Sequence, residues 1–325
     1  MDRWPDFFLA GAPKAGTTAL HAALVGVPGI ALSRPKEPKY FMCGDRPPPR
    51  SQHRGPGDAH SRREWIWRRE DYLGLWHGAP SWALRGESTP FYLFDKASHR
   101  RIAEVNPDAR FVVLLRDPVD RAYSNWMHLW SDGLEPEPDF LTAVEAEESR
   151  CAAGWAPFWR YRDLGRYGEQ LASLREHFPA EQILTMRYRC LVTEPDATVR
   201  QVLDFLGVDA EAAPAIPRDN SRAFRPDSTR NRFLAGAARA GAALGAYAPP
   251  QVWRAASMPL LKQLHRADVD RPELTSQQRS QVMAPLLSDI ELLERVTGES
   301  FADWRAEVGG GSYAARVAQR DNASV

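Results

Sequence analysis

The segment GAPKAGTT, from Gly11 to Thr18, combines glycines, a lysine and two hydroxyl side chains. Glycines allow a tight turn whose backbone N–H groups face an anion, and a helix that begins directly after the turn adds the positive end of its dipole. The segment is not a Walker A loop, because no lysine follows its second glycine. We predict a phosphate-binding loop of another type, the alternative being a glycine turn with an incidental lysine. Its candidate ligands are Lys14, Ala15, Gly16, Thr17 and Thr18.

The charge composition gives Lys14 more weight. The chain has 325 residues, with 42 basic and 42 acidic side chains and a formal net charge of zero. This balance argues against a nucleic-acid-binding protein and against a polybasic protein at a membrane surface. Only five of the basic side chains are lysines, and three of these fall within the first forty residues. They are Lys14, Lys36, Lys39, Lys96 and Lys262.

A second candidate anion site lies in RDPVDRAYSNWMH, from Arg116 to His128. Arg116 ends a strongly apolar run, and its guanidinium is suited to a phosphate. Ser124 lies two turns into the helix expected next, and helical spacing places it roughly on one face with Arg121 and His128. We predict that Arg116 and Ser124 bind a second phosphate. The alternative for Arg116 is a surface ion pair with Asp117 or Asp120.

Short apolar runs and helical patterns provide the elements that would position these side chains. Parallel strands buried on both faces read as continuous apolar runs, and Asp117-Pro118 is a good start for a helix. Alternating strands and helices predict an α/β protein with a central, mostly parallel sheet flanked by helices. The expected strands are Phe7–Ala10, Ile30–Leu32, Arg110–Leu115 and Gln182–Met186. The expected helices include Thr17–Val25, Trp65–Trp76, Tyr167–Phe178 and Asp196–Leu206.

The C-terminal part predicts a further helix. Thr275 and Gln278 form a capping box, and Gly298 is a stop signal. The residues Met283, Leu287, Ile290 and Leu293 would form its apolar face. We expect one domain over residues 1–307, a mobile loop over 43–63 that could gate the substrate, and a flexible tail over 308–325.

Three widely spaced cysteines, Cys43, Cys151 and Cys190, form no zinc or disulfide pattern, which fits a reducing compartment. The N-terminal apolar run is too short for a signal peptide, and the Ala/Gly-rich stretch 233–248 is not hydrophobic enough for a membrane span. We therefore expect a cytoplasmic protein without a membrane span.

Together, the two anion motifs resemble those of the sulfotransferases that use 3′-phosphoadenosine 5′-phosphosulfate (PAPS). The resemblance continues in SRPKEPKYF, GESTPFYL, GRYGEQLASLREHF and DFLGV, and the pattern from Arg271 to Trp304 resembles bacterial members related to the heparan-sulfate type. It implies a P-loop-like three-layer fold. It also implies that Lys14, Gly16, Thr17 and Thr18 bind the 5′-phosphosulfate end of PAPS, and that Arg116 and Ser124 bind its 3′-phosphate.

Transfer to a hydroxyl requires a group that takes the hydroxyl proton. In KEPKYF, Glu37 matches the glutamate that the heparan-sulfate type uses as general base. The alternative is a loop glutamate paired with Lys36 or Lys39. His128 is the rival base, although a lone histidine on a helix is more often structural. By analogy with phosphoryl transfer, the acceptor would attack in line, Lys14 would stabilise the leaving phosphate, and no metal would be required.

Two places depart from the resemblance. The heparan-sulfate type tends to carry a lysine where this chain has Ser88, which argues with the neutral net charge against a heparin-like acceptor. Arg222 and Arg225 fall where related proteins place a basic residue over the nucleotide, although a solvated loop explains them equally well. Several of the tryptophans near residues 43–63 could stack on a sugar or an apolar acceptor, while most are expected in the core.

The sequence predicts a PAPS-dependent sulfotransferase that releases 3′-phosphoadenosine 5′-phosphate (PAP). The expected acceptor is a small molecule or carbohydrate: a sugar, a glycolipid or a secondary metabolite. One rival is a small-molecule kinase with a degenerate P-loop, although its usual lysine and a convincing Walker B aspartate are missing. The other is a non-catalytic nucleotide-binding protein of the same fold. The acceptor and the oligomeric state cannot be read from the sequence.

Overall fold

The computed structural model describes residues 3–48, 55, 65–209, 236 and 272–306. Within them, a sheet of five strands runs in the order β2-β3-β1-β4-β5. All four pairings between neighbouring strands are parallel. The strands are β1 (Phe7–Gly11), β2 (Ile30–Leu32), β3 (Leu84–Glu87), β4 (Arg110–Leu115) and β5 (Ile183–Arg187).

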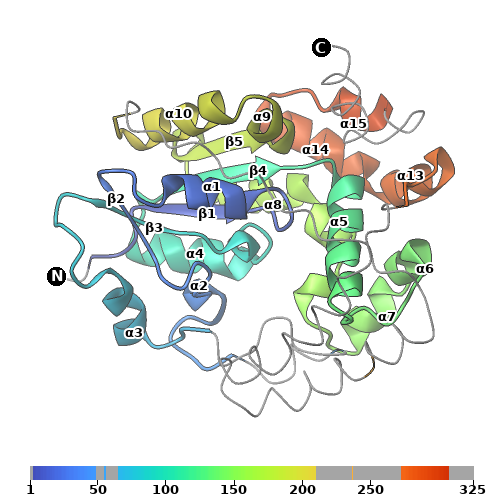
Figure 1. Ribbon diagram of the computed structural model, residues 1–325, viewed down its shortest axis with the longest axis horizontal. Helices are drawn as coiled ribbons and strands as arrows, with labels where there is room; N and C mark the ends of the chain where they lie inside the picture. Colours follow the sequence, from blue (N-terminus) through green and yellow to red (C-terminus); the bar gives the residue numbers. More distant parts are fainter. Residues whose placement is uncertain (1–2, 49–54, 56–64, 210–235, 237–271, 307–325) are drawn as a thin grey trace.

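Helices cover both faces of this sheet (Figure 1), as parallel strands require. On one face, α1 (Thr17–Leu24) contacts α10 (Pro195–Leu206). On the other face, α4 (Lys96–Val105) contacts α8 (Tyr167–Arg175), which packs on α14 (Leu287–Thr297). The predicted α/β three-layer fold is confirmed.

The remaining helices lie around this centre. They are α2 (Tyr40–Cys43), α3 (Arg69–Leu73), α5 (Pro118–Ser131), α6 (Phe140–Glu145), α7 (Glu147–Ala152), α9 (Tyr188–Thr193), α13 (Ser276–Met283) and α15 (Ala302–Ala306). Short 3₁₀ helices include η3 (Gly74–Trp76), η4 (Pro90–Tyr92), η6 (Asp163–Gly165) and η9 (Ala284–Leu286).

The apolar runs of β1 and β4 form the buried centre of the sheet. The side chains from Phe7 to Ala10 are at most 1% exposed, and so are those from Phe111 to Leu115. In contrast, β3 was not expected as a strand, because its residues Leu-Arg-Gly-Glu form neither an apolar run nor an alternating pattern. It forms between β2 and β1, where its backbone completes the hydrogen bonding of both neighbours.

β1 and β4 are adjacent, but their connections lead to opposite faces of the sheet. The chain after β1 enters α1 directly, whereas the chain after β4 passes through α5 to α8 on the other face. In open α/β sheets, ligands bind outside the carboxyl ends of the strands at such a divergence. Both candidate anion motifs begin at this edge.

One predicted helix is much shorter than expected. The Trp65–Trp76 helix is wrong at its start: only Arg69–Leu73 is α-helical, and Arg68 is extended, with ψ at 133°. Before it, the Ile66 N–H donates to the Pro38 carbonyl at 2.9 Å instead of continuing a helix. In the C-terminal part the capping box of Thr275 and Gln278 is confirmed.

The apolar face predicted beyond Met283 is interrupted. Pro285 cannot donate a helical hydrogen bond, and the chain passes through η9 between α13 and α14. Leu287 is therefore 39% exposed, whereas Ile290 and Leu293 are buried as expected. Gly298 ends α14 with φ at 73°, as predicted.

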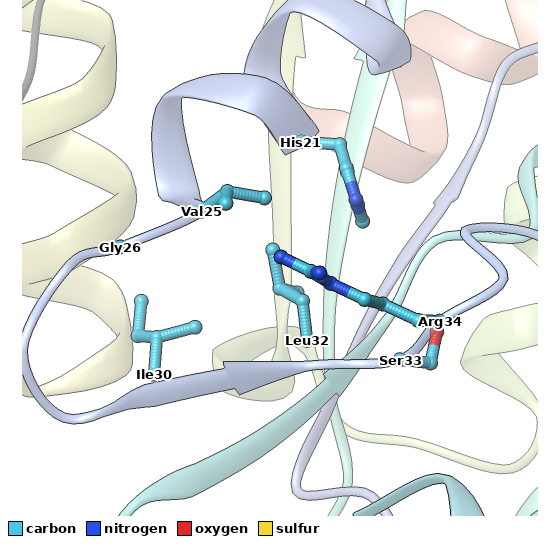
Figure 2. Close-up of a pocket in the computed structure, with 7 residues that line it drawn as sticks. All are labelled: His21, Val25, Gly26, Ile30, Leu32, Ser33 and Arg34. Atoms are coloured by element: carbon cyan, nitrogen blue, oxygen red, sulfur yellow. The ribbon is translucent and has the colours of Figure 1, made fainter.

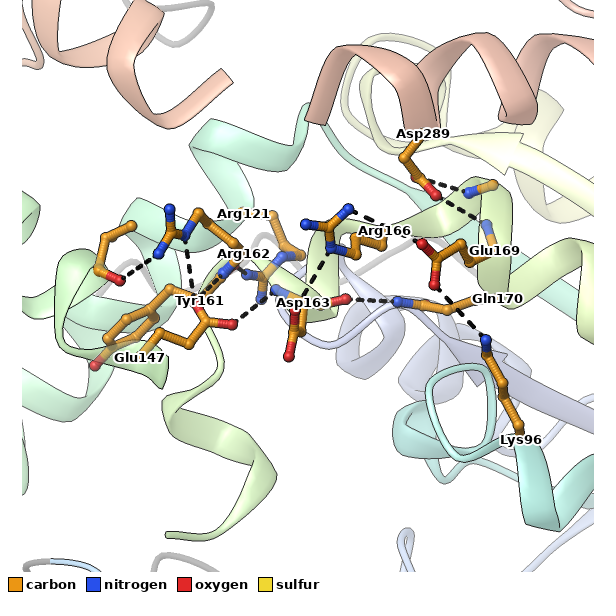
Figure 3. Close-up of polar contacts among 12 residues, drawn as sticks. Lys96, Arg121, Glu147, Tyr161, Arg162, Asp163, Arg166, Glu169, Gln170 and Asp289 are labelled. Atoms are coloured by element: carbon orange, nitrogen blue, oxygen red, sulfur yellow. Dashed lines mark hydrogen bonds and ion pairs between the residues drawn. The ribbon is translucent and has the colours of Figure 1, made fainter. Parts of the chain in front are cut away.

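Buried carboxylates hold the segment between α7 and α8 in place (Figure 3). Glu147 accepts hydrogen bonds from the backbone N–H groups of Arg162 and Asp163, at 2.7 and 2.9 Å. Asp289 of α14 accepts from Gly168 and Glu169 at the start of α8, both at 2.9 Å. These bonds satisfy backbone donors that would otherwise be orphaned by burial.

Several sequence predictions fall outside the described residues: most of the 43–63 loop, the 308–325 tail, Arg222, Arg225 and Lys262. Of the remaining lysines, Lys96 lies 3.7 Å from Glu169 in an exposed ion pair (Figure 3). All three cysteines are free. In the part of the chain that the structure describes, no helix is long and apolar enough to cross a membrane, and no group of His, Cys, Asp and Glu side chains is arranged to hold a metal ion.

Arg279 of α13 joins the C-terminal helices to α5. Its guanidinium lies 2.5 Å from Asp120 and 3.2 Å from Asp117, and all three side chains are largely buried. Replacing it by methionine leaves two buried carboxylates without their cation. We expect Arg279→Met to lower the free energy of unfolding by about 3–5 kcal/mol. The matched control, Lys96→Met, removes an exposed pair and should change it by less than about 0.5 kcal/mol. Urea denaturation of both variants measures the difference, and equal values would contradict the prediction.

Candidate active site

The GAPKAGTT segment forms a tight turn between β1 and α1. Lys14 has φ at 67° and Gly16 has φ at 87°, so two left-handed residues reverse the chain directly before the helix. Gly16 is the N-cap of α1, and no side chain caps this end of the helix. The N-terminus of α1 carries the partial positive charge of the helix dipole.

Arg116 lies at the end of β4, beside this turn. Its Nη1 donates to the Lys14 carbonyl at 3.2 Å, so the two candidate anion sites are in direct contact. The alternative ion pair with Asp117 or Asp120 is not formed. Asp117 caps α5 through the N–H groups of Val119 and Asp120, and both aspartates face Arg279. Among the described residues, no carboxylate lies within 4.0 Å of the Arg116 guanidinium.

Two tyrosines position Arg116, and the sequence analysis missed both. The guanidinium carbon lies 4.8 Å from the ring centre of Tyr188, which follows β5 directly. The Tyr167 hydroxyl donates to the Arg116 carbonyl at 3.0 Å, and burial raises the pKa of this phenol. Tyr188 could have been found, because it follows the carboxyl end of a predicted strand. Tyr167 could not, because it stands at the start of a helix remote in sequence.

The three residues that helical spacing places on one face of α5 have different surroundings. Arg121 is fully buried and donates to the Tyr161 carbonyl, so it points into the protein (Figure 3). Ser124 is partly exposed. The His128 ring lies against Phe158, and its Nε2 is 3.9 Å from Asp132. Ten residues separate it from Pro118 at the start of α5, which corresponds to roughly 15 Å along the helix.

Glu37 lies next to the phosphate loop. Its Oε1 accepts from Lys36 Nζ at 2.9 Å, and the same ammonium donates to Thr18 Oγ1 at 3.2 Å. One lysine thus connects the candidate base to the start of α1. Lys39 takes a different place: it is 3% exposed, with Nζ 5.5 Å from the Trp65 ring centre. The pairing of Glu37 with a neighbouring lysine, which the sequence offered as the alternative to a role as base, is therefore present, with Lys36.

A cavity of about 160 Å³ lies between α1 and β2, one helical turn beyond Thr18. Figure 2 shows the Arg34 side chain extending toward Val25, with the His21 ring pointing toward it. His21 Nδ1 is 2.8 Å from Ser88 Oγ. Burial, helped by the charges of Lys36 and Arg34, lowers the pKa of His21 to about 4, so the ring is neutral. The lining residues are His21, Val25, Gly26, Ile30, Leu32, Ser33 and Arg34.

A parallel sheet covered on both faces, with a glycine turn that leads into a helix after β1, defines a P-loop-like α/β fold. Comparison with known proteins identifies the family. The sequence profile of the sulfotransferase family matches residues 5–212. The chain belongs to this family, as the resemblance predicted.

The relatives include mouse heparan sulfate glucosamine 3-O-sulfotransferase 3B1, 28% identical over 205 residues, or 63% of this chain and 46% of that protein. Human bifunctional heparan sulfate N-deacetylase/N-sulfotransferase 3 is 27% identical over 64% of this chain and 23% of its own. This chain therefore spans about half the length of the mouse relative and 23% of the length of the human one. A sulfotransferase structure from Alicyclobacillus acidocaldarius superimposes with a TM-score of 0.71 at 26% identity, over 93% of this chain and 99% of that one.

Gly16 tests the phosphate loop. A Cβ added there would lie 2.7 Å from Leu191 and 3.0 Å from Tyr188, in a backbone conformation that already strains any other residue. We expect Gly16→Ala to displace the turn and to weaken PAP binding at least tenfold in isothermal titration calorimetry. Gly26→Ala is the control, because Gly26 has φ at 89° but no atom within 4 Å of the added Cβ. It should lose about 1–2 kcal/mol of stability from strain alone and keep its PAP affinity. Equal affinities of the two variants would argue against the loop as an anion site.

Proposed function

We propose that this chain transfers a sulfuryl group from PAPS to an acceptor hydroxyl. The observation that carries the proposal is the contact between the Lys14 turn and Arg116 at the carboxyl ends of β1 and β4. It supports two phosphate sites side by side, one at a helix N-terminus and one at a guanidinium whose nearest aspartates are held by Arg279. Membership of the sulfotransferase family supports the same reaction.

The described residues fit the nucleotide. Lys14 and the N–H groups at Gly16, Thr17 and Thr18 would hold its 5′ end, and Arg116 with Ser124 would hold the 3′-phosphate. The Ala15 N–H already donates to the Ala12 carbonyl at 3.2 Å, so Ala15 would shape the turn instead. When bound, PAPS supplies a sulfuryl group attached to a phosphate leaving group. Lys14 and the α1 N-terminus would stabilise the negative charge that grows on this phosphate, which lowers the barrier only to the extent that they bind the transition state more tightly.

Glu37 is the proposed general base. Its carboxylate is partly exposed, and the bond to Lys36 turns it toward the start of α1. His128 is less well placed for this role, because it lies in the last turn of α5, with Asp132 beside it.

The proposed acceptor is a sugar, a glycolipid or a secondary metabolite. The names of the relatives, which act on heparan sulfate, favour a carbohydrate. Ser88 stands where the heparan-sulfate type carries a lysine, and its hydroxyl pairs with the neutral His21. The adjoining cavity offers Val25 and Ile30 with a single guanidinium, from Arg34, which suits an acceptor less anionic than heparan sulfate. A cytoplasmic location stays a prediction.

Ligand-dependent melting tests the nucleotide site. PAP should raise the melting temperature well above the effect of AMP at the same concentration, because only PAP carries a 3′-phosphate for Arg116. Arg116→Met should reduce the PAP shift to that of AMP. If ATP with Mg²⁺ stabilises the protein more than PAP does, the kinase alternative is favoured instead.

Transfer from ³⁵S-labelled PAPS to a panel of heparan sulfate and neutral aryl glycosides tests the base. Glu37→Gln should lower kcat by roughly 10²–10⁴-fold, the usual contribution of a general base, without changing the PAP dissociation constant. His128→Gln is the control and should retain the kcat of the parent. The reverse result would assign the base to His128, and nucleotide binding without transfer or PAPS hydrolysis would favour the non-catalytic alternative.

A further inference from the structure

The loop that carries Glu37 is fastened to the segment after β3 at three points. The Ser88 N–H donates to the Lys36 carbonyl at 3.3 Å. The Lys39 N–H donates to Thr89 Oγ1 at 3.3 Å, and the Phe41 N–H donates to the Tyr92 hydroxyl at 3.2 Å. Glu37 lies between the first two of these bonds.

A buried carboxylate supports the second of these bonds. Glu87, the last residue of β3, is completely buried and accepts hydrogen bonds from the hydroxyls of Thr89 and Tyr72. Because the Thr89 hydroxyl donates its hydrogen bond to Glu87, its oxygen lone pairs are left to accept from the Lys39 N–H. The result is a chain of bonds from Glu87 through Thr89 to the backbone two residues beyond Glu37.

The backbone around Lys39 needs this support. Lys39 has φ at 60°, a left-handed conformation that costs a non-glycine residue roughly 1–2 kcal/mol. Its N–H lies in a buried environment, where an unsatisfied donor is costly. Thr89 thus satisfies a buried backbone donor two residues beyond the candidate base.

We propose that Glu87 and Thr89 are positioning residues for the reaction: through the Lys39 N–H they hold the Glu37 loop against the phosphate loop. This inference rests on the proposed role of Glu37. It assigns to a buried pair, which touches neither nucleotide nor acceptor, the placement of the group that takes the proton. Displacements of about 1 Å in such a group can reduce turnover by roughly 100-fold.

The electrostatic environment of Glu87 is that of a structural carboxyl group. Burial raises its pKa to about 7, against the hydrogen bonds from Thr89, Tyr72 and Tyr92, and the nearby charge of Glu37 raises it further. A carboxyl group with so unfavourable a site needs donors on every side, and its donors come from α3, η4 and the segment between β3 and η4. The Glu87 carboxylate therefore links three neighbouring segments of the structure.

A pair of variants at Thr89 separates positioning from simple loss of stability. Thr89→Val keeps the shape and removes the hydroxyl, whereas Thr89→Ser keeps the hydroxyl. We expect Thr89→Val to lower kcat by about 10- to 100-fold while the PAP dissociation constant changes less than twofold, and Thr89→Ser to recover most of the rate. Thr198→Val is the matched control: Thr198 is 3% exposed, and its hydroxyl donates to Glu194 in α10, remote from Glu37. It should keep the parent rate.

Hydrogen exchange read by mass spectrometry gives a readout that needs no acceptor. The peptide covering residues 36–41 should exchange faster in Thr89→Val and in Glu87→Gln, and at the parent rate in Thr89→Ser. Unchanged exchange in both variants, or equal loss of kcat in Thr89→Val and Thr89→Ser, would overturn the proposal. If Glu37→Gln is fully active or PAP does not bind, the proposed function fails instead, whatever the exchange result.

Discussion

The hydrogen-bonded pairing of β1 with β4 is the constraint on which the site depends. It brings the end of one apolar strand beside the end of another that lies about a hundred residues later in the sequence. The chain then leaves these two ends toward opposite faces, and Arg116 contacts the Lys14 turn at the point where they diverge. The proposed nucleotide site lies at this junction, where the positive end of α1 and the Arg116 guanidinium are neighbours.

The C-terminal helices support this arrangement indirectly, through Arg279. Asp117 and Asp120 follow Arg116 directly and would be its natural partners. Arg279 of α13 holds both of them instead, in a largely buried network, and Tyr188 and Tyr167 support Arg116 from β5 and α8. A carboxylate bound to Arg116 would compete with a phosphate. The fold avoids this competition by supplying a second arginine from a helix more than 150 residues away.

The candidate base is placed in a comparable way. Glu37 belongs to a loop with a strained backbone at Lys39, and this loop is held on one side by Lys36 and Thr18 and on the other by the Glu87–Thr89 pair. Buried polar groups with satisfied hydrogen bonds would fix the position of Glu37, since such networks have few alternative arrangements. The same groups would be unfavourable in the core if any donor were missing.

Local patterns in the sequence predict the strands β1, β2, β4 and β5, the glycine turn and the capping box of Thr275, because these follow from apolar runs and from residue types that act on their neighbours. The same patterns single out Lys14 and Arg116, and the family resemblance adds Glu37. They do not predict β3, whose residues become a strand only between two partners, or the break at Pro285. Which side chains meet is a tertiary matter: Arg279 with Asp117, Tyr167 with Arg116, and Thr89 with Lys39. Each pair joins residues far apart in the chain, and only the order of the strands and the packing of the helices bring them together.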